Sequence, residues 1–140
     1  MTAVRQVVVM ITTSYPRFPG DGIGSFIAPI AQGVAARGHE VHLVAPAHPD
    51  IRLPAEENGV RFHFYRYAPG NPTSWGYASG LKADTALRAS AWMAAPLGVI
   101  AGVRAARRVA STYRATVLHA HWVIPNGVIA AAAAHSLPIV

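Results

Sequence analysis

The sequence of 140 residues contains no cysteine. A chain without thiols forms no disulfide, holds no zinc or iron–sulfur cluster through sulfur, and has no cysteine nucleophile. Long apolar runs are also missing, because the longest candidate for a membrane-spanning helix, residues 89–103, is short and contains Pro96. Arg5 precedes a short apolar run, but no small-residue cleavage site follows, so no signal peptide is indicated. We therefore expect a soluble cytoplasmic chain.

Charged residues are scarce, at 13% of the chain against about a quarter in ordinary domains. The chain has six acidic residues, and Lys82 is the only lysine among twelve basic residues, which gives a net charge of +6. Four of the acids fall between residues 40 and 57, so a paired-carboxylate glycosidase site is disfavoured, and the G-x-S-x-G hydrolase motif is absent. The basic residues are spread along the chain without a nucleic-acid-binding motif, so we expect no nucleic acid partner.

What is present is an alternation of strand and helix patterns. The apolar β-branched run 6–12, a Gly- and Pro-rich loop, a helix over 25–37 and a strand over 40–45 form a βαβ unit, whose strands should be parallel. Further along, we expect an exposed connection (46–59), a strand (60–67), a loop with exposed aromatic residues (69–77), helices over 81–113 split near Pro96, a strand (116–121), a short helix from 125, and a strand from 137. The fold class is α/β, with a Rossmann-like, mostly parallel sheet and helices on both faces.

The loop before the first helix is the first candidate site. Gly22, Ile23, Gly24 and Ser25 lie where a helix N-terminus follows the carboxyl end of a strand, and such a terminus favours an anion such as a phosphate. The pattern matches G-x-G but has Ile27 where the Rossmann fingerprint has its third glycine, and it is not a P-loop. A second interpretation stays open, namely that the glycines only serve the turn.

The second candidate site follows the strand over 116–121. His121 and Trp122 should lie at the carboxyl edge of the sheet, where open α/β folds bind ligands. A histidine can bond a sugar hydroxyl and a tryptophan offers a flat apolar face, while Asn126 either contacts the ligand or caps the next helix. His119 shares a strand face with His121, but the sequence shows no third metal ligand, so we predict no metal and no cofactor.

A third feature is basic. Arg104, Arg107 and Arg108 share one helix face after an apolar stretch, and such a face either rests on an anionic membrane surface or is simply solvated.

These pieces together resemble the N-terminal domain of GT-B fold glycosyltransferases, specifically glycosyltransferase family 4. The residues that carry the resemblance are the opening strand with Thr12-Thr-Ser-Tyr-Pro16, the run Gly22-Ile-Gly-Ser-Phe26, the run Arg37-Gly-His-Glu-Val41, the run His119-Ala-His-Trp-Val-Ile-Pro-Asn-Gly127, and Leu137-Pro-Ile-Val140.

The resemblance implies that residues 1–140 are the N-terminal, acceptor-side domain of a retaining enzyme, which moves a sugar from a nucleotide-sugar donor to a glycan or lipid hydroxyl without a metal. The glycine loop would approach the donor diphosphate. The acceptor and sugar cleft would be lined by Ser14, Tyr15, His121, Trp122 and Asn126. Several members of the family act on lipids at the membrane, so the resemblance favours a peripheral location at its inner face.

The strand from 137 stops at Val140, so we expect a truncated chain whose nucleotide-sugar-binding domain is absent or supplied by another chain. No catalytic residue is expected within the chain, and it should be inactive alone. One alternative is a stand-alone acceptor- or lipid-binding subunit that acts with a separate catalytic chain. A dinucleotide-binding dehydrogenase or epimerase is disfavoured, because the second strand runs into Ala45-Pro-Ala-His48 without the acidic residue that would bind ribose.

Overall fold

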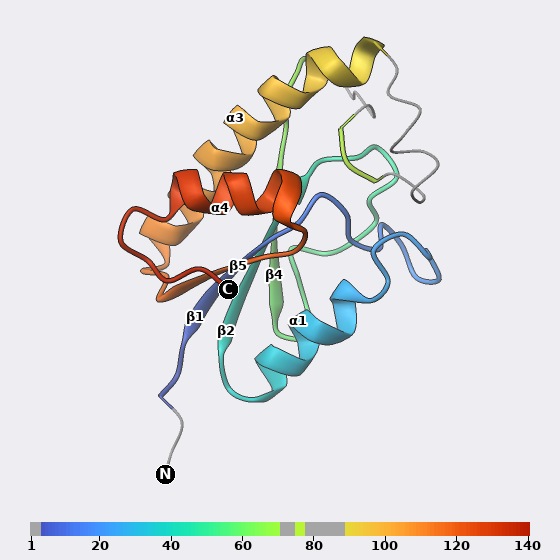
Figure 1. Ribbon diagram of the computed structural model, residues 1–140. Coiled ribbons are helices and arrows are strands. Elements are labelled where there is room, and N and C mark those ends of the chain that lie inside the picture. Colours follow the sequence, from blue (N-terminus) through green and yellow to red (C-terminus); the bar gives the residue numbers. More distant parts are fainter. Residues whose placement is uncertain (1–3, 71–74, 78–88) are drawn as a thin grey trace.

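The computed structural model describes residues 4–70, 75–77 and 89–140 (Figure 1). Five strands form one sheet in the order β3-β4-β2-β1-β5. Their bounds are β1 Val7–Ile11, β2 Glu40–Pro46, β3 Glu56–Glu57, β4 Val60–Tyr65 and β5 Val117–Ala120. All neighbouring pairs are parallel except β3 with β4. Within the described residues, the helices are α1 Ile27–Ala36, α3 Ala89–Thr112 and α4 Val128–Ala133, with the one-turn η1 Val123–Gly127 before α4.

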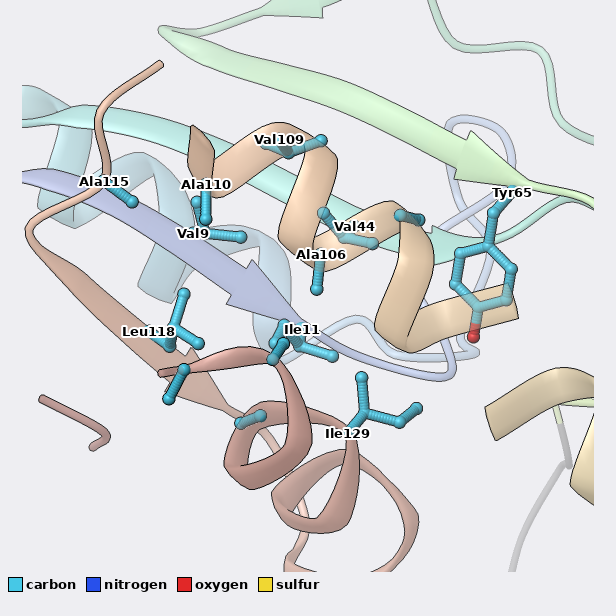
Figure 2. Close-up of a cluster of buried hydrophobic side chains, with 14 residues drawn as sticks. Val9, Ile11, Val44, Tyr65, Ala106, Val109, Ala110, Ala115, Leu118 and Ile129 are labelled. Carbon is cyan, nitrogen blue, oxygen red and sulfur yellow. The ribbon is translucent and has the colours of Figure 1, made fainter. Parts of the chain in front are cut away.

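Helices cover both faces of this sheet, as the sequence predicts (Figure 1). On one face, α3 and α4 pack on Val9, Ile11 and Leu118 (Figure 2). On the other face, α1 packs through Ile27 and Ala31 on the alternate residues of β1 and β2. Strand β4 contributes to both layers because its side chains alternate: Val60 and Phe62 belong to the second cluster and Tyr65 to the first.

The end of the chain extends the sheet beyond β5. Ile139 pairs with Leu118 in parallel, and the Val140 N–H donates to the Leu118 carbonyl at 2.9 Å. The expected strand from 137 is therefore present as a short pairing on the outer side of β5.

Three local expectations are corrected. Residues 46–59 contain the short strand β3, because Glu56 and Glu57 turn back at Asn58-Gly59 and pair with Arg61 and Val60. Trp75 is half-buried and Tyr77 is buried rather than exposed: the Tyr77 hydroxyl donates to the Pro46 carbonyl at 2.7 Å, and the indole Nε1 of Trp75 donates to the Tyr65 hydroxyl at 3.1 Å.

The third correction is that Pro96 does not split the helix. Helix α3 runs from Ala89 to Thr112 through this residue, and the expected helical pattern over 81–88 lies outside the described residues. Proline removes one backbone donor, but Pro96 faces solvent. Packing on either side of it holds the helix, since Ala94 is buried and the Trp75 ring lies against Gly98. Among the helices within the described residues, none is long and apolar enough to cross a membrane.

Candidate functional site at the carboxyl edge of the sheet

The carboxyl ends of β1 and β5 lie side by side, because the two strands are parallel and paired from Val8–Val117 to Ile11–Ala120. The chain leaves β1 through Thr13 and Ser14 and leaves β5 through His121 and Trp122. The two exits are joined by hydrogen bonds: the His121 N–H donates to the Ile11 carbonyl at 3.0 Å. The two sequence-predicted sites therefore meet at one edge. We call Ser14, Gly24, His121, Trp122 and Asn126 the edge site.

The glycine loop packs on the end of β1. A Cβ at Gly24 would lie 2.9 Å from backbone atoms of Ser14 and Tyr15, and the φ of Gly24 is +67°, so packing and backbone conformation both require glycine there. Gly22 is exposed, and a Cβ on it would meet nothing within 4 Å. The interpretation that the glycines serve the turn thus holds for Gly24, while packing gives no reason for glycine at 22.

An ion pair that sequence reasoning missed fixes the shape of this loop. The Asp21 carboxylate accepts from the Arg17 Nε at 2.7 Å, and also from the backbone N–H groups of Arg17 at 3.0 Å and Ile23 at 3.1 Å. The Arg17 guanidinium is the main cause that holds the pKa of Asp21 well below its usual range. Opposite charges four residues apart across a Pro- and Gly-rich turn were the available signal.

Helix α1 begins directly after the loop. Its first turn has no side-chain cap and no acidic residue. The positive end of the helix dipole is therefore not neutralised from within the turn, which suits an anion near Ser25. Ser25 is exposed and Ile23 half-buried.

His121 is 8% exposed, and its Nε2 has no hydrogen-bond partner among the residues that the structure describes. Its ring lies against that of His119, with centroids 4.4 Å apart. Burial, followed by the neighbouring His119, lowers the pKa of His121 to about 4. The imidazole is therefore neutral at pH 7, and its Nε2 is a buried hydrogen-bonding atom. Among the described residues, no group of three histidine or acidic side chains is placed to hold a metal.

Asn126 is fully buried and closes the loop that contains Trp122. Its Nδ2 donates to the His121 carbonyl at 2.6 Å and reaches the Thr13 Oγ1 at 3.5 Å. Its Oδ1 has no hydrogen-bond partner within the described part of the chain. It does not cap α4 by its side chain. Its contacts instead hold the β5 exit against the β1 exit.

Trp122 is 59% exposed and has a φ of +74°, which is rare for a bulky residue. Its ring meets Phe26 of the glycine loop edge-on, with centroids 5.9 Å apart. Val123 and Ile124 beside it are also exposed. The indole thus stands on the surface between the two exits, with apolar neighbours.

One predicted residue, Tyr15, is placed differently. Tyr15 is 2% exposed and packs on Phe62 in the core, so its side chain does not line the edge. Ser14 is half-buried, and its backbone N–H donates to the buried Thr12 hydroxyl at 3.2 Å. The contact partners Thr13 and Phe26 were not predicted.

The three arginines on α3, namely Arg104, Arg107 and Arg108, have different surroundings. All three side chains are exposed, but the Arg107 guanidinium donates to the Ala132 carbonyl of α4, whereas Arg104 and Arg108 line a groove beside β4. The three arginines therefore do not form one continuous basic surface. Its contact with an anionic membrane stays a prediction.

The edge site offers a hydrogen-bonding imidazole, a buried amide oxygen, a flat indole face and an uncapped helix N-terminus. These groups suit a sugar and a nearby anion, and the fold is a Rossmann-like domain of the kind that forms the N-terminal half of GT-B glycosyltransferases. The sequence of residues 21–140 matches the protein-family model of the glycosyl transferase 4-like domain. The chain belongs to this family. A search of curated proteins gives no match to the sequence.

Proposed function

We propose that the chain is the acceptor-side domain of a retaining glycosyltransferase, which transfers a hexose from a nucleotide-sugar donor to a hydroxyl of a lipid or glycan. The observation that carries the proposal is the pair of buried polar atoms without partners, His121 Nε2 and Asn126 Oδ1, in a chain of this family. Buried polar groups are ordinarily bonded, and a ligand hydroxyl would satisfy them.

Each group then has a role. The Trp122 face stacks on a sugar ring, the His121 Nε2 bonds a sugar hydroxyl, and the loop 22–25 with the start of α1 faces the donor diphosphate. The exposed apolar side chains around Trp122, namely Phe26, Val123 and Ile124, favour an acceptor with an apolar, lipid-like part.

We further propose that the chain needs a nucleotide-sugar-binding partner domain for transfer. Asp21, the acidic residue of the glycine loop, is bound to Arg17, so it is not available to act on a donor sugar. Purified chain incubated with UDP- and GDP-hexoses and octyl glycosides should give no product by mass spectrometry. Detectable transfer would contradict this part of the proposal.

Binding tests the site itself. NMR titration of the ¹⁵N-labelled chain with octyl and methyl glycosides should shift the Trp122 indole signal, with octyl glycosides binding more tightly. His121→Ala should weaken binding at least tenfold, and the exposed His135→Ala should leave it within twofold. Absence of saturable shifts for every glycoside and sugar nucleotide, or equal effects of the two variants, would refute the assignment.

A further inference from the structure

A second concave surface, lined by other residues than the edge site, lies between helix α3 and β4. This groove has a volume of about 640 Å³. Its basic lining residues are His63 and Arg66 from β4 and the segment after it, and Arg104 and Arg108 from α3. Ala101 and Ala105 of α3 contribute an apolar wall. None of the five edge-site residues lines this groove.

The three arginines of the groove have no acidic partner among the residues that the structure describes. The described carboxylates that form ion pairs are bound elsewhere: Asp21 and Asp50 to Arg17, Glu40 to Arg5 and Arg61, and Glu56 to Arg61. Arg66, Arg104 and Arg108 are all exposed. Three guanidinium groups around one groove repel each other, and an anion that bonds them removes this repulsion.

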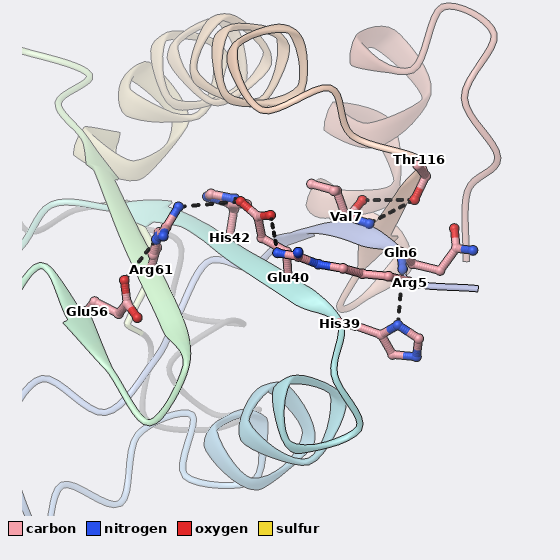
Figure 3. Close-up of polar contacts among 9 residues, drawn as sticks. All are labelled: Arg5, Gln6, Val7, His39, Glu40, His42, Glu56, Arg61 and Thr116. Carbon is pink, nitrogen blue, oxygen red and sulfur yellow. Dashed lines mark hydrogen bonds and ion pairs between the residues drawn. The ribbon is translucent and has the colours of Figure 1, made fainter. Parts of the chain in front are cut away.

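His63 is held in a defined orientation behind the arginines. Its Nε2 lies 3.0 Å from the Nδ1 of His42. The His42 Nε2 in turn lies 3.0 Å from the Glu40 Oε1, a contact that Figure 3 shows. His42 is fully buried, and its ring stacks on Tyr113 of the segment after α3 at 3.9 Å. With Glu40 ionised, His42 donates through Nε2 and accepts through Nδ1, so His63 donates through Nε2. The His63 Nδ1 is then the nitrogen left for a ligand.

The groups around His63 are mostly basic. His42 bonds its Nε2, Arg66, Arg104 and Arg108 line the same groove, and the Tyr113 ring lies 5.5 Å from its ring. Burial, then His42 and Arg61, lowers the pKa of His63. An anion in the groove would oppose this effect and favour a protonated His63 that donates to it.

We propose that the groove binds a soluble phosphate ester, whose phosphate is bonded by Arg66, Arg104, Arg108 and His63 and whose organic part lies on Ala101 and Ala105. A phosphate monoester carries close to two charges and three acceptor oxygens, which suits a groove lined by several donors better than a single carboxylate does. A flat membrane surface fits less well, because His63 is half-buried behind the arginines and Arg107 is bonded to α4. This site is independent of the proposed transferase function.

The test is a titration of the whole 140-residue chain with phenyl phosphate and with inorganic phosphate, followed by NMR signals of the His63 imidazole. We expect a saturable shift with phenyl phosphate that binds more tightly than inorganic phosphate. Arg104→Gln with Arg108→Gln should weaken binding at least tenfold, and Arg104→Gln alone about fivefold. Arg114→Gln, which removes an exposed arginine outside the groove, should change it less than twofold. Circular dichroism checks that each variant is folded.

Three results would overturn the proposal. They are the absence of a saturable His63 shift, an equal loss of binding in Arg114→Gln, and binding only to phosphatidylglycerol vesicles in an Arg104- and Arg108-dependent manner. The last result would assign these arginines to a membrane surface instead. Binding of octyl glycosides at the edge site is measured separately, so failure of one assignment does not decide the other.

Discussion

The amino end and the carboxyl end of the parallel sheet each bury a histidine, but they treat it differently. His42, at the amino end, is fully buried and both of its ring nitrogens have partners, namely His63 and Glu40. Figure 3 shows the contact with Glu40. His121, at the carboxyl end, is almost as buried, and its Nε2 has none. Similar burial of the same residue type thus serves two purposes, and the state of the hydrogen bonds separates them.

The surroundings of the two histidines differ in the same way. At the amino end, Arg5 pairs with Glu40, and the Val7 N–H donates to the Thr116 hydroxyl (Figure 3). At the carboxyl end, Trp122 has a positive φ and stands in solvent beside the exposed Val123. Unusual backbone conformation and unsatisfied polar atoms gather at functional sites, whereas closed networks stabilise the fold.

The largest expected effect is that of Gly24→Ala at the carboxyl end. The added methyl group would meet the backbone of Ser14 and Tyr15 at 2.9 Å with φ at +67°, so we expect a loss of about 4 kcal/mol in the free energy of unfolding. Gly22→Ala, which meets nothing within 4 Å, is the matched control and should cost less than about 1 kcal/mol. Urea denaturation measures both, and equal losses would show that the loop does not depend on close packing.

The second effect is a pH dependence of the free energy of unfolding, which arises from His121 at the carboxyl end of the sheet. The folded chain holds the pKa of His121 at about 4, and an unfolded histidine titrates near 6.5. Between these two pH values His121 is protonated in the unfolded chain and neutral in the folded chain. The free energy of unfolding therefore falls as the pH falls from 6.5 to 4. The loss amounts to at most about 3 kcal/mol from this group.

The pKa values of His48, His63 and His119 are lowered as well, chiefly by burial, so these groups act in the same direction. Urea denaturation at several pH values checks the slope. Replacing His121 by leucine should flatten it, and an unchanged slope in that variant would show that His121 is not the main proton acceptor.

The third effect is that of His42→Leu at the amino end. The leucine leaves the Glu40 carboxylate and the His63 Nε2 without their buried partner, at a cost of about 2 kcal/mol. His39→Leu, at the same end of the sheet, loses one contact to the Gln6 N–H and should cost about half as much. A neutral His42→Leu would mean that the network does not stabilise the sheet.

The smallest expected effect is the difference in stability between two variants that each disrupt an ion pair. Asp21→Asn weakens the bonds to a guanidinium that is only 15% exposed and should cost about 1 kcal/mol. Arg5→Gln breaks a pair whose arginine is 69% exposed and should cost less than about 0.5 kcal/mol. Thermal unfolding of the two variants measures the difference. The reverse order would show that the loop pair contributes less than a surface pair.

The sequence predicts the layers of this fold well, because buried parallel strands are continuous apolar runs and β4 alternates strictly. It does not reveal that α3 continues through Pro96, because Trp75 packs on Gly98 from a distant loop. Nor does it reveal β3, whose two glutamates have little strand propensity and pair only because Asn58-Gly59 turns the chain.

For the edge site, the sequence places His121, Trp122 and the glycine loop at the correct end of the sheet, since parallel strands share their carboxyl edge. The sequence does not predict how these side chains are oriented. Tyr15 turns into the core toward Phe62, and Asn126 turns inward to the His121 carbonyl, because contacts between separate segments decide both.

The most direct test of the account compares the free energies of unfolding of His121→Leu and His42→Leu with that of the unaltered chain. If the buried Nε2 of His121 is kept for a ligand, its loss removes an unsatisfied polar atom, and His121→Leu should be as stable as the original chain or more stable at pH 7. His42→Leu should lose about 2 kcal/mol in the same experiment. An equal loss in both variants would contradict the distinction between the two ends of the sheet.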